Sequence, residues 1–207
     1  MRKITKGNEP AELMSWKRKN PRGRYDDLSH LERGAINQAT RKEQFGLCAY
    51  CCKKIGESDS MNEHVEAQNI AKNRTLDFSN IVASCITPKQ CDAAHGSQPL
   101  PLTPLMVECE TELKFYFSGE VEGLTDRAKQ AIDVLNLNNQ SLIAKRKQQI
   151  KTLVMPPDTT ESVLFWDSET IELFISEYLQ KVDNDGKLEA YSPVLVNVLR
   201  QKLYSKR

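Results

Sequence analysis

The chain has 207 residues, of which 39% are hydrophobic and 28% are charged, as in an ordinary globular protein. This length can bury a core and suits either one domain or two small ones. The opening segment, MRKITKGNEP, has no apolar stretch of the kind a signal peptide needs, and no later apolar run approaches the roughly 20 residues of a membrane span. We therefore expect a cytoplasmic protein, and the composition excludes a membrane-spanning class.

Charge is distributed unevenly along the chain, although the net charge is only +1. Residues 1–24 carry eight basic side chains against two acidic ones, and residues 127–151 carry six against one. Residues 156–190 carry nine acidic side chains against two basic ones. Basic segments can bind phosphate, although most are simply solvated, and acidic segments are repelled by nucleic acid.

The first elements along the chain are predicted to be helices. Pro10 suits the first turn of a short helix that extends through Trp16. Ser29 and Glu32 have the spacing of a capping box, and Gly46 is placed to end the helix that follows. Apolar residues recur along that second helix at helical spacing, at Leu28, Leu31, Ala35 and Ala39.

The middle of the chain changes character between residues 47 and 104, where short β-prone runs and polar loops contain five of the six cysteines. The sequence FYFSGEVEG, residues 115–123, is typical of a strand and a turn. Two helices are expected over residues 125–138 and 139–154, with asparagines at their junction that suit a cap.

The C-terminal part is predicted to be helical after a boundary at Pro156-Pro157. Two apolar stripes at helical spacing are expected to be core, the first made by Ile171, Phe174, Tyr178 and Val182 and the second by Val194, Leu195, Val198 and Leu199. The sequence DNDG at residues 183–186 is too short for a calcium loop and predicts a turn.

Four cysteines have the spacing of two metal knuckles. Cys48 and Cys51 form a CxxC, and Cys85 and Cys91 form a wider pair about 34 residues further on. Four thiolates suit a structural zinc ion, whose binding would stabilise this loop-rich segment. A redox dithiol and a set of unrelated buried cysteines are the alternatives. Two cysteines are spare, one able to substitute for a neighbouring ligand and one expected to pack as a small apolar residue: Cys52 and Cys109, respectively.

A second group of polar residues lies within and just after the cysteine segment. Glu63 and His64 are adjacent, Asn80 follows 16 residues after His64, and the run Cys91-Asp92-x-x-His95-Gly closes the segment. Each residue alone is more typical of a strand surface, a core imidazole or a turn. Their order, bracketed by the cysteine pairs, indicates a joint function.

This ordered set resembles the HNH endonucleases. The sequences EQFGLCAYC, NEHVEAQN, LDFSNIVASC and IDVLNLNNQSLIAKRKQQI, with the basic start ELMSWKRKNP, are similar to the retron- and Septu-associated HNH proteins of bacteria (PtuB-like). The resemblance covers roughly residues 10 to 155. It implies an α+β fold in which a small zinc-stabilised ββα-metal unit (HNH, His-Me finger) is embedded in a mainly α-helical chain.

The composition and the helical patterns divide the chain into four segments, of which the resemblance identifies the second as the nuclease core. These are a basic helical segment, a nuclease core with zinc knuckles, a strand, turn and helical pair that pack on the core, and a C-terminal helical segment, at residues 1–46, 47–104, 105–157 and 158–207.

The resemblance assigns roles to the polar residues. His64 would be the general base, and the amide of Asn80 would bridge loop backbone and hold that histidine in place. Glu63 and Asp92 are hard oxygen ligands suited to Mg²⁺ or Mn²⁺, and His95 would complete the metal shell or touch phosphate. The family more often has histidine where this chain has Asp92, and lysine where it has His95. The candidate nucleic-acid contacts are basic residues near the N-terminus, Lys17, Arg18, Lys19, Arg22 and Arg24.

The function that follows is a metal-dependent endonuclease, with DNA the favoured substrate, that acts in a bacterial anti-phage system with an ATPase and, in some systems, a reverse transcriptase and its RNA. An RNA-cleaving nuclease and a non-catalytic zinc-stabilised binding module are the alternatives. The acidic segment at residues 158–191 is the expected docking surface for the ATPase. We expect the thiols and the Glu63-His64 pair to be neighbouring sites with separate roles.

Overall fold

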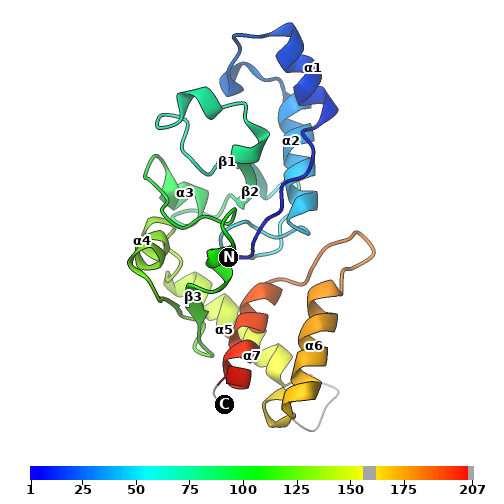
Figure 1. Ribbon diagram of the computed structural model, residues 1–207, viewed down its shortest axis with the longest axis vertical. Helices are drawn as coiled ribbons and strands as arrows, with labels where there is room; N and C mark the ends of the chain where they lie inside the picture. The colour runs from blue at the N-terminus through cyan, green and yellow to red at the C-terminus, as the bar shows by residue number, and fades with distance from the viewer. Residues whose placement is uncertain (156–161, 205–207) are drawn as a thin grey trace.

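The computed structural model describes residues 1–155 and 162–204. Its α-helices are, in chain order, α1 (Ala11–Lys19), α2 (His30–Glu43), α3 (Asp92–His95), α4 (Asp126–Val134), α5 (Gln140–Val154), α6 (Ser168–Gln180) and α7 (Ser192–Tyr204). Its strands form two antiparallel pairs, β1 (Ser60–His64) with β2 (Ile81–Cys85) and β3 (Leu113–Phe115) with β4 (Val121–Gly123). The described chain is therefore α+β, as predicted. Figure 1 shows α1, α2 and the β1–β2 pair in the upper part of the molecule and α5, α6 and α7 in the lower part.

The N-terminal helices form where the sequence predicts them, but the buried face of α2 differs. Ser29 Oγ accepts a hydrogen bond from the Leu31 N–H, and the Glu32 carboxylate accepts one from the Ser29 N–H, so the capping box is confirmed. Leu31 was predicted to face the core, and this was wrong because it is 67% exposed. Helix α2 instead buries Ile36 and Thr40, and Leu31 lies five positions before Ile36, about 140° around the helix.

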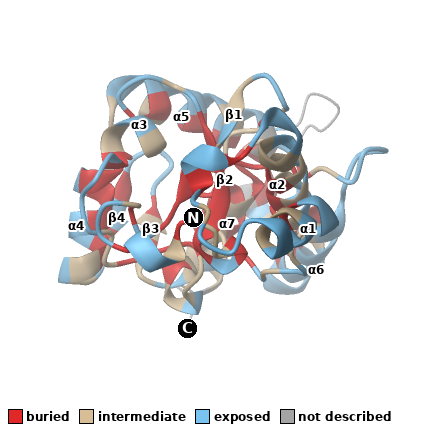
Figure 2. Ribbon diagram, turned by 90° about the horizontal axis from the view of Figure 1, so that it is seen from above, coloured by how far each residue is buried: buried red, intermediate tan, exposed pale blue. Residues whose placement is uncertain are grey.

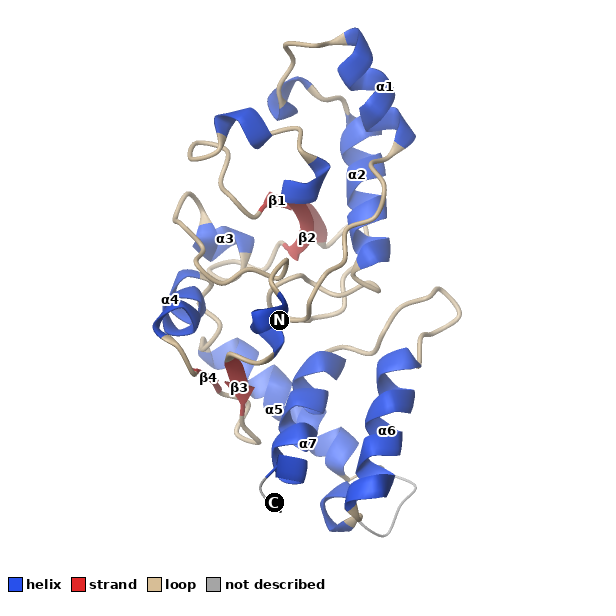
Figure 3. Ribbon diagram, in the orientation of Figure 1, coloured by secondary structure: helices blue, strands red, loops and turns tan. Residues whose placement is uncertain are grey.

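The β1–β2 pair is the element on which the candidate site is built. All five residues of β2 are buried, and His64 and Glu63 of β1 pair with Ile81 and Val82 of β2. In Figure 3 the pair lies between α2 on one side and α3 on the other. Because β2 is buried and β1 pairs with it along its whole length, the backbone that carries Glu63 and His64 is fixed.

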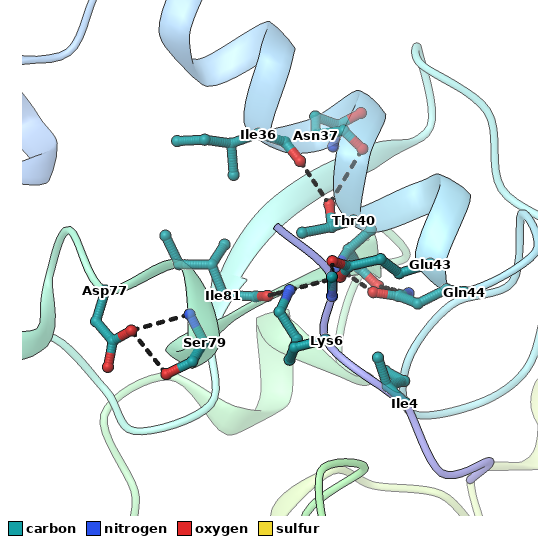
Figure 4. A network of polar contacts seen from close by, with 12 residues as sticks. Ile4, Lys6, Ile36, Asn37, Thr40, Glu43, Gln44, Asp77, Ser79 and Ile81 are labelled. Atoms are coloured by element: carbon teal, nitrogen blue, oxygen red, sulfur yellow. Dashed lines mark hydrogen bonds and ion pairs between the residues drawn. The ribbon is translucent and has the colours of Figure 1, made fainter. Parts of the chain in front are cut away.

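Side chains from the end of α2 and from the N-terminal segment tie α2 to β2. The Gln44 amide accepts from the Ala83 N–H at 2.7 Å and donates to the Ala83 carbonyl at 2.8 Å, so it occupies the place of a strand neighbour. Lys6 Nζ donates to Glu43 Oε2 at 2.6 Å and to the Ile81 carbonyl at 2.8 Å (Figure 4). These bonds fix the distance between the helix and the strand pair.

The region after α3 contains a hairpin and two helices. Residues 115–123 were expected to form one strand and a turn, and they contribute to both strands of the β3–β4 hairpin. The turn needs Gly119, which has a φ of +89°, because a Cβ there would lie 2.2 Å from the Ile143 carbonyl oxygen of α5. Asn139 caps α5 as predicted, since its side chain accepts from the Leu142 N–H at 2.9 Å.

The C-terminal helix α7 belongs to the core. The stripe formed by Val194, Leu195, Val198 and Leu199 is buried, as predicted. Figure 2 shows β2 and α7 mostly in the buried colour. The side chain of Asn197 accepts from the Phe115 N–H at 2.9 Å and donates to the Leu113 carbonyl at 2.9 Å, which binds α7 to β3.

The other C-terminal predictions had mixed outcomes. Val182 was predicted to continue the stripe of α6, and this was wrong because the helix ends at Gln180 and Val182 is 42% exposed. The turn at residues 183–186 is confirmed, with the Asp183 carboxylate accepting from two backbone N–H groups. The Pro156-Pro157 boundary lies outside the described residues.

The main hydrophobic cluster joins the N-terminal segment to residues after α2, among them Ile4, Val82, Leu135 and Val198. A smaller cluster joins α1, α2 and the start of β2. The division into four segments stays a prediction. None of the described helices is long and apolar enough to span a membrane.

Candidate functional site

Four cysteines converge at the end of the β1–β2 pair where β2 terminates. Cys48 and Cys51 lie in a turn before β1, Cys85 is the last residue of β2, and Cys91 immediately precedes α3. Their sulfur atoms all lie within 4.8 Å of one another, and all four residues are buried. A tetrahedral zinc site with Zn–S bonds of about 2.3 Å has sulfurs about 3.8 Å apart. The cluster therefore fits a metal ion such as zinc.

The surroundings of the cluster also suit bound thiolates. The Gln90 amide nitrogen lies 3.7–3.8 Å from the sulfurs of Cys51, Cys85 and Cys91. The Cys85 N–H donates to Cys48 Sγ at 3.3 Å. Hydrogen bonds from Cys48, Cys51 and Cys91 lower the pKa of Cys85, whereas the pKa values of Cys51 and Cys91 are raised, so the neighbouring thiols stabilise a thiolate at Cys85. A divalent cation would take the place of the remaining thiol protons.

The two other cysteines stay outside this cluster. Cys52 packs with Leu47 and Leu188, and Cys109 is fully buried in the main core. Burial raises the pKa of the Cys109 thiol to about 12, which makes it inert. All six thiols are free. The prediction that Cys109 packs as an apolar residue is confirmed.

Glu63 accepts hydrogen bonds from two side chains that are close in sequence to the cysteine pairs. Its Oε1 accepts from the Tyr50 hydroxyl at 3.1 Å and from His95 Nδ1 at 2.5 Å. Burial works to raise the pKa of Glu63, but hydrogen bonds with His95, Asp92 and Tyr50 outweigh it, and the pKa lies below its usual value. With Oε1 occupied by two donors, the second carboxylate oxygen is left for Asp92 or for a cation.

Asp92 forms a carboxylate pair with Glu63. Burial, the hydrogen bond with Glu63 and the negative charge of Glu63 raise the pKa of Asp92 to about 8. The backbone N–H of Asp92 donates to Ser84 Oγ at 3.3 Å, which fixes the start of α3 against β2. Two carboxylates that share one proton are a typical divalent-cation site, because a cation can replace the proton.

His64 is held in one tautomer. Its Nε2 lies 2.9 Å from the Thr75 carbonyl oxygen, which can only accept, so Nε2 carries the proton and Nδ1 carries the lone pair. The ring packs edge-on against Tyr25, with 4.7 Å between the ring centroids. Burial lowers the pKa of His64, although the Thr75 carbonyl and Glu63 act to raise it. The imidazole is therefore neutral near pH 7 and can accept a proton at Nδ1.

Asn80 lies behind His64 and binds the loop that follows it. Its Oδ1 accepts from the Glu66 N–H at 2.8 Å, and its Nδ2 donates to the Glu66 carbonyl at 3.0 Å. The backbone carbonyl of Asn80 accepts from the Val65 N–H at 2.9 Å. The amide thus bridges loop backbone next to His64, in the arrangement that the resemblance implies.

An open cleft of about 810 Å³ gives access to three of these residues. Glu63, His64 and Asp92 line it, together with residues of α2 and of the loop at residues 67–69. Asn80 and His95 lie outside the lining, and His95 is fully buried. His95 Nε2 has no hydrogen-bond partner among the described residues.

The cleft contains residues that the sequence did not single out, and it omits others that the sequence did. Tyr25, His30 and Arg33 line it, although His30 had been taken as an ordinary helix residue. The spacing of three residues between His30 and Arg33, at the start of α2, could have indicated that the two side chains share one face of the helix. The five predicted nucleic-acid contacts, Lys17, Arg18, Lys19, Arg22 and Arg24, do not line the cleft. Lys17 is paired with Glu9.

Comparison with known proteins identifies relatives but no matching family model. The chain is 25% identical over 170 residues to the "Retron Vc95 putative HNH endonuclease" of Vibrio cholerae serotype O1 biovar El Tor, an alignment that covers 73% of this chain and 83% of that protein. It is 28% identical over 97 residues to the "Retron Ec83 putative HNH endonuclease" of Escherichia coli, covering 42% of this chain and 38% of that protein. The chain is therefore similar to two retron proteins that are named as putative HNH endonucleases.

The comparisons confirm the predicted resemblance at the level of the HNH family and its association with retrons. They support a nuclease of the HNH type. The narrower likeness to Septu-associated, PtuB-like proteins is not supported by these relatives and stays a prediction.

Proposed function

We propose that this protein is a metal-dependent HNH endonuclease that hydrolyses phosphodiester bonds of nucleic acid. The observation that carries the proposal is that Glu63, His64 and Asp92 line one cleft, with the lone pair of His64 on Nδ1. In this reading β1, β2 and α3 form the ββα-metal unit, in that order along the chain. The relatives in retrons support the same class of activity.

Glu63 and Asp92 would hold one Mg²⁺ or Mn²⁺, because both carboxylates line the cleft and share a proton without it. The bound ion would offset negative charge on the scissile phosphate and on the leaving oxygen. His95 had been assigned to the metal shell or to phosphate. We now assign it to holding Glu63, because its Nδ1 is bonded to that carboxylate and its ring is fully buried.

His64 would accept the proton of the attacking water at Nδ1. The hydrogen bond from Nε2 to the Thr75 carbonyl keeps the other nitrogen protonated and fixes the direction of the lone pair. Asn80 would keep the loop after His64 in place, so that the imidazole does not rotate out of the cleft.

The four-cysteine cluster would hold a structural Zn²⁺ through Cys48, Cys51, Cys85 and Cys91. Its position behind β1 and α3 explains how a polar segment with short elements keeps the carboxylates in register. Zinc would take no part in the chemistry, because the cluster is buried and outside the cleft.

DNA is the favoured substrate, and the basic N-terminal side chains, Lys17, Arg18, Lys19, Arg22 and Arg24, would contact it outside the cleft. Defence against phage with an ATPase, and in some systems with a reverse transcriptase and its RNA, is the proposed cellular role. The docking surface would now include the exposed Phe165 and Leu173, near the start and on the outer face of α6, and not α7, which is core.

The test is cleavage of labelled single- and double-stranded DNA and RNA by purified protein, with Mg²⁺ or Mn²⁺ and with chelator. His64→Ala is the control for contaminating nucleases. Metal-dependent cleavage of DNA that this variant lacks supports the proposal, and cleavage of RNA alone supports the RNA-cleaving alternative. If the parent and His64→Ala bind nucleic acid equally and neither cleaves it, even with the partner present, the zinc-stabilised binding module is the remaining function.

A further inference from the structure

One face of α2 forms part of the catalytic cleft. The residues of α2 that line the cleft are His30, Arg33, Gly34 and Asn37. Their spacing of three, four and seven positions places them on a single face of the helix. The same cleft contains Glu63, His64 and Asp92, so this face borders the reacting groups.

The guanidinium of Arg33 is oriented by hydrogen bonds to backbone carbonyls and has no ion-pair partner among the described residues. Its Nε donates to the Leu28 carbonyl at 3.1 Å, and its Nη2 donates to the carbonyls of Tyr25 and Asp26 at 3.3 and 3.0 Å. The guanidinium also lies 5.0 Å from the centre of the Tyr25 ring. Among the described residues no carboxylate lies within ion-pair distance of Arg33, and Nη1 has no hydrogen-bond partner.

Gly34 leaves open space at the same point of the helix. A Cβ built on Gly34 would meet no protein atom within 4 Å. Glycine inside a helix is unfavourable compared with nearly every other residue, and packing within this chain does not require it here. Close approach of a bound molecule to the helix backbone is a reason for a glycine at such a position.

We propose that the sugar-phosphate backbone of the nucleic-acid substrate lies along this face of α2, passing over Gly34, with Arg33 Nη1 donating to a phosphate oxygen. Arginine suits this task because its guanidinium stays charged and is already oriented by three backbone carbonyls. His30, exposed at the first position of α2, lies on the same path. The proposal rests on the proposed nuclease function and adds how the strand is placed in the cleft.

The first test measures binding separately from cleavage. Affinity for fluorescein-labelled DNA and RNA oligonucleotides is measured by anisotropy in a His64→Ala background, over a range of salt concentrations. Arg33→Gln should weaken binding about 10- to 100-fold, the usual effect of losing a hydrogen bond to a charged group. It should also reduce the slope of log affinity against log salt by about 0.7–0.9, since one phosphate contact is lost. The affinity of Arg33→Lys should lie between those of the parent and Arg33→Gln. Arg200 is an exposed arginine on α7, so Arg200→Gln is the control that removes the same charge elsewhere.

The second test uses steric obstruction and does not depend on charge. Gly34→Met should raise the melting temperature by about 2–4 °C, because methionine is a good helix former. The same change should lower both nucleic-acid affinity and the cleavage rate of the otherwise unmodified protein at least tenfold, since the side chain would fill the strand path. Gln38→Met, exposed on α2 but outside the cleft, is the matched control.

The outcomes separate the two proposals. If the parent binds nucleic acid but does not cleave it, and Arg33→Gln reduces the affinity and the salt slope, the strand placement holds and the nuclease assignment fails. If the parent cleaves and Gly34→Met is folded and cleaves equally fast, the strand does not pass over α2. An unchanged affinity and salt slope in folded Arg33→Gln would also overturn the placement.

Discussion

Replacing Tyr50 by phenylalanine removes one hydroxyl group from the centre of the candidate site. Tyr50 is 1% exposed, and its hydroxyl donates to Glu63 Oε1 at 3.1 Å. Phenylalanine keeps the aromatic ring and its edge contact with His95. Glu63 would then keep only His95 as a donor to Oε1 and would be held less firmly.

The expected size of this effect follows from the kind of bond that is lost. A hydrogen bond to a charged group contributes about 1.5–3 kcal/mol, which corresponds to about 10- to 100-fold in an equilibrium constant. The bond from His95 remains, so we expect the lower half of that range. The loss should appear as weaker Mn²⁺ binding and as a higher Mn²⁺ concentration for half-maximal cleavage.

The assay is calorimetric Mn²⁺ titration of protein that retains its zinc, paired with cleavage at each Mn²⁺ concentration. Tyr116→Phe is the matched control, because Tyr116 makes the same type of hydrogen bond to Glu122 on the exposed β3–β4 hairpin. Zinc content should be equal in all three proteins. If Tyr50→Phe binds Mn²⁺ and cleaves like the parent, Glu63 is either not a metal ligand or not held by Tyr50.

Three further predictions concern the other parts of the molecule. Elemental analysis should find one zinc per chain, and Cys48→Ser with Cys91→Ser should remove it and unfold the segment, whereas retained zinc would contradict the cluster. His64→Ala should reduce cleavage about 10²- to 10⁴-fold with zinc content and nucleic-acid affinity nearly unchanged, and cleavage at the parent rate would exclude a general base at this position. The double change Phe165→Ser with Leu173→Ser should weaken co-purification of the ATPase partner and leave the melting temperature unchanged. Undiminished binding of the partner would place the docking surface elsewhere.

The sequence predicted the local elements of this fold better than their packing. Ser29 and Asn139 are helix caps whose signal lies within three residues of chain, and both act as predicted. Leu31 failed because periodicity alone does not say which side of a helix faces the core. The role of α7 needed the tertiary structure, since its bonds through Asn197 join residues more than 80 positions apart.

The candidate site shows the same division. The cysteine spacing predicted a cluster that the fold brings together, because each knuckle is short and each pair is held by a turn. The contacts of His95 could not be predicted, since they depend on how α3 packs against β1. His95 was assigned by its distance in sequence from Asp92, whereas the fold turns its ring inward to Glu63. Arg33 was overlooked because it lies in a different element from the motif, and only the fold places α2 beside β1.

The contacts change the relation expected between the thiols and the Glu63-His64 pair. Two separate roles were expected, and this stays a prediction, although the four cysteines are buried and do not line the cleft. The positions are nevertheless coupled. Tyr50 lies between Cys48 and Cys51 and binds Glu63, and Asp92 follows Cys91 directly and pairs with the same carboxylate. Both carboxylates of the proposed metal site are therefore positioned from the cysteine pairs, one through a side-chain hydrogen bond and the other through the backbone. His64 is positioned independently, by the Thr75 carbonyl and by the loop that Asn80 holds. A disturbance of the cysteine cluster should thus act more strongly on the carboxylates than on the base, because His64 is connected to the cluster through the paired backbones of β1 and β2.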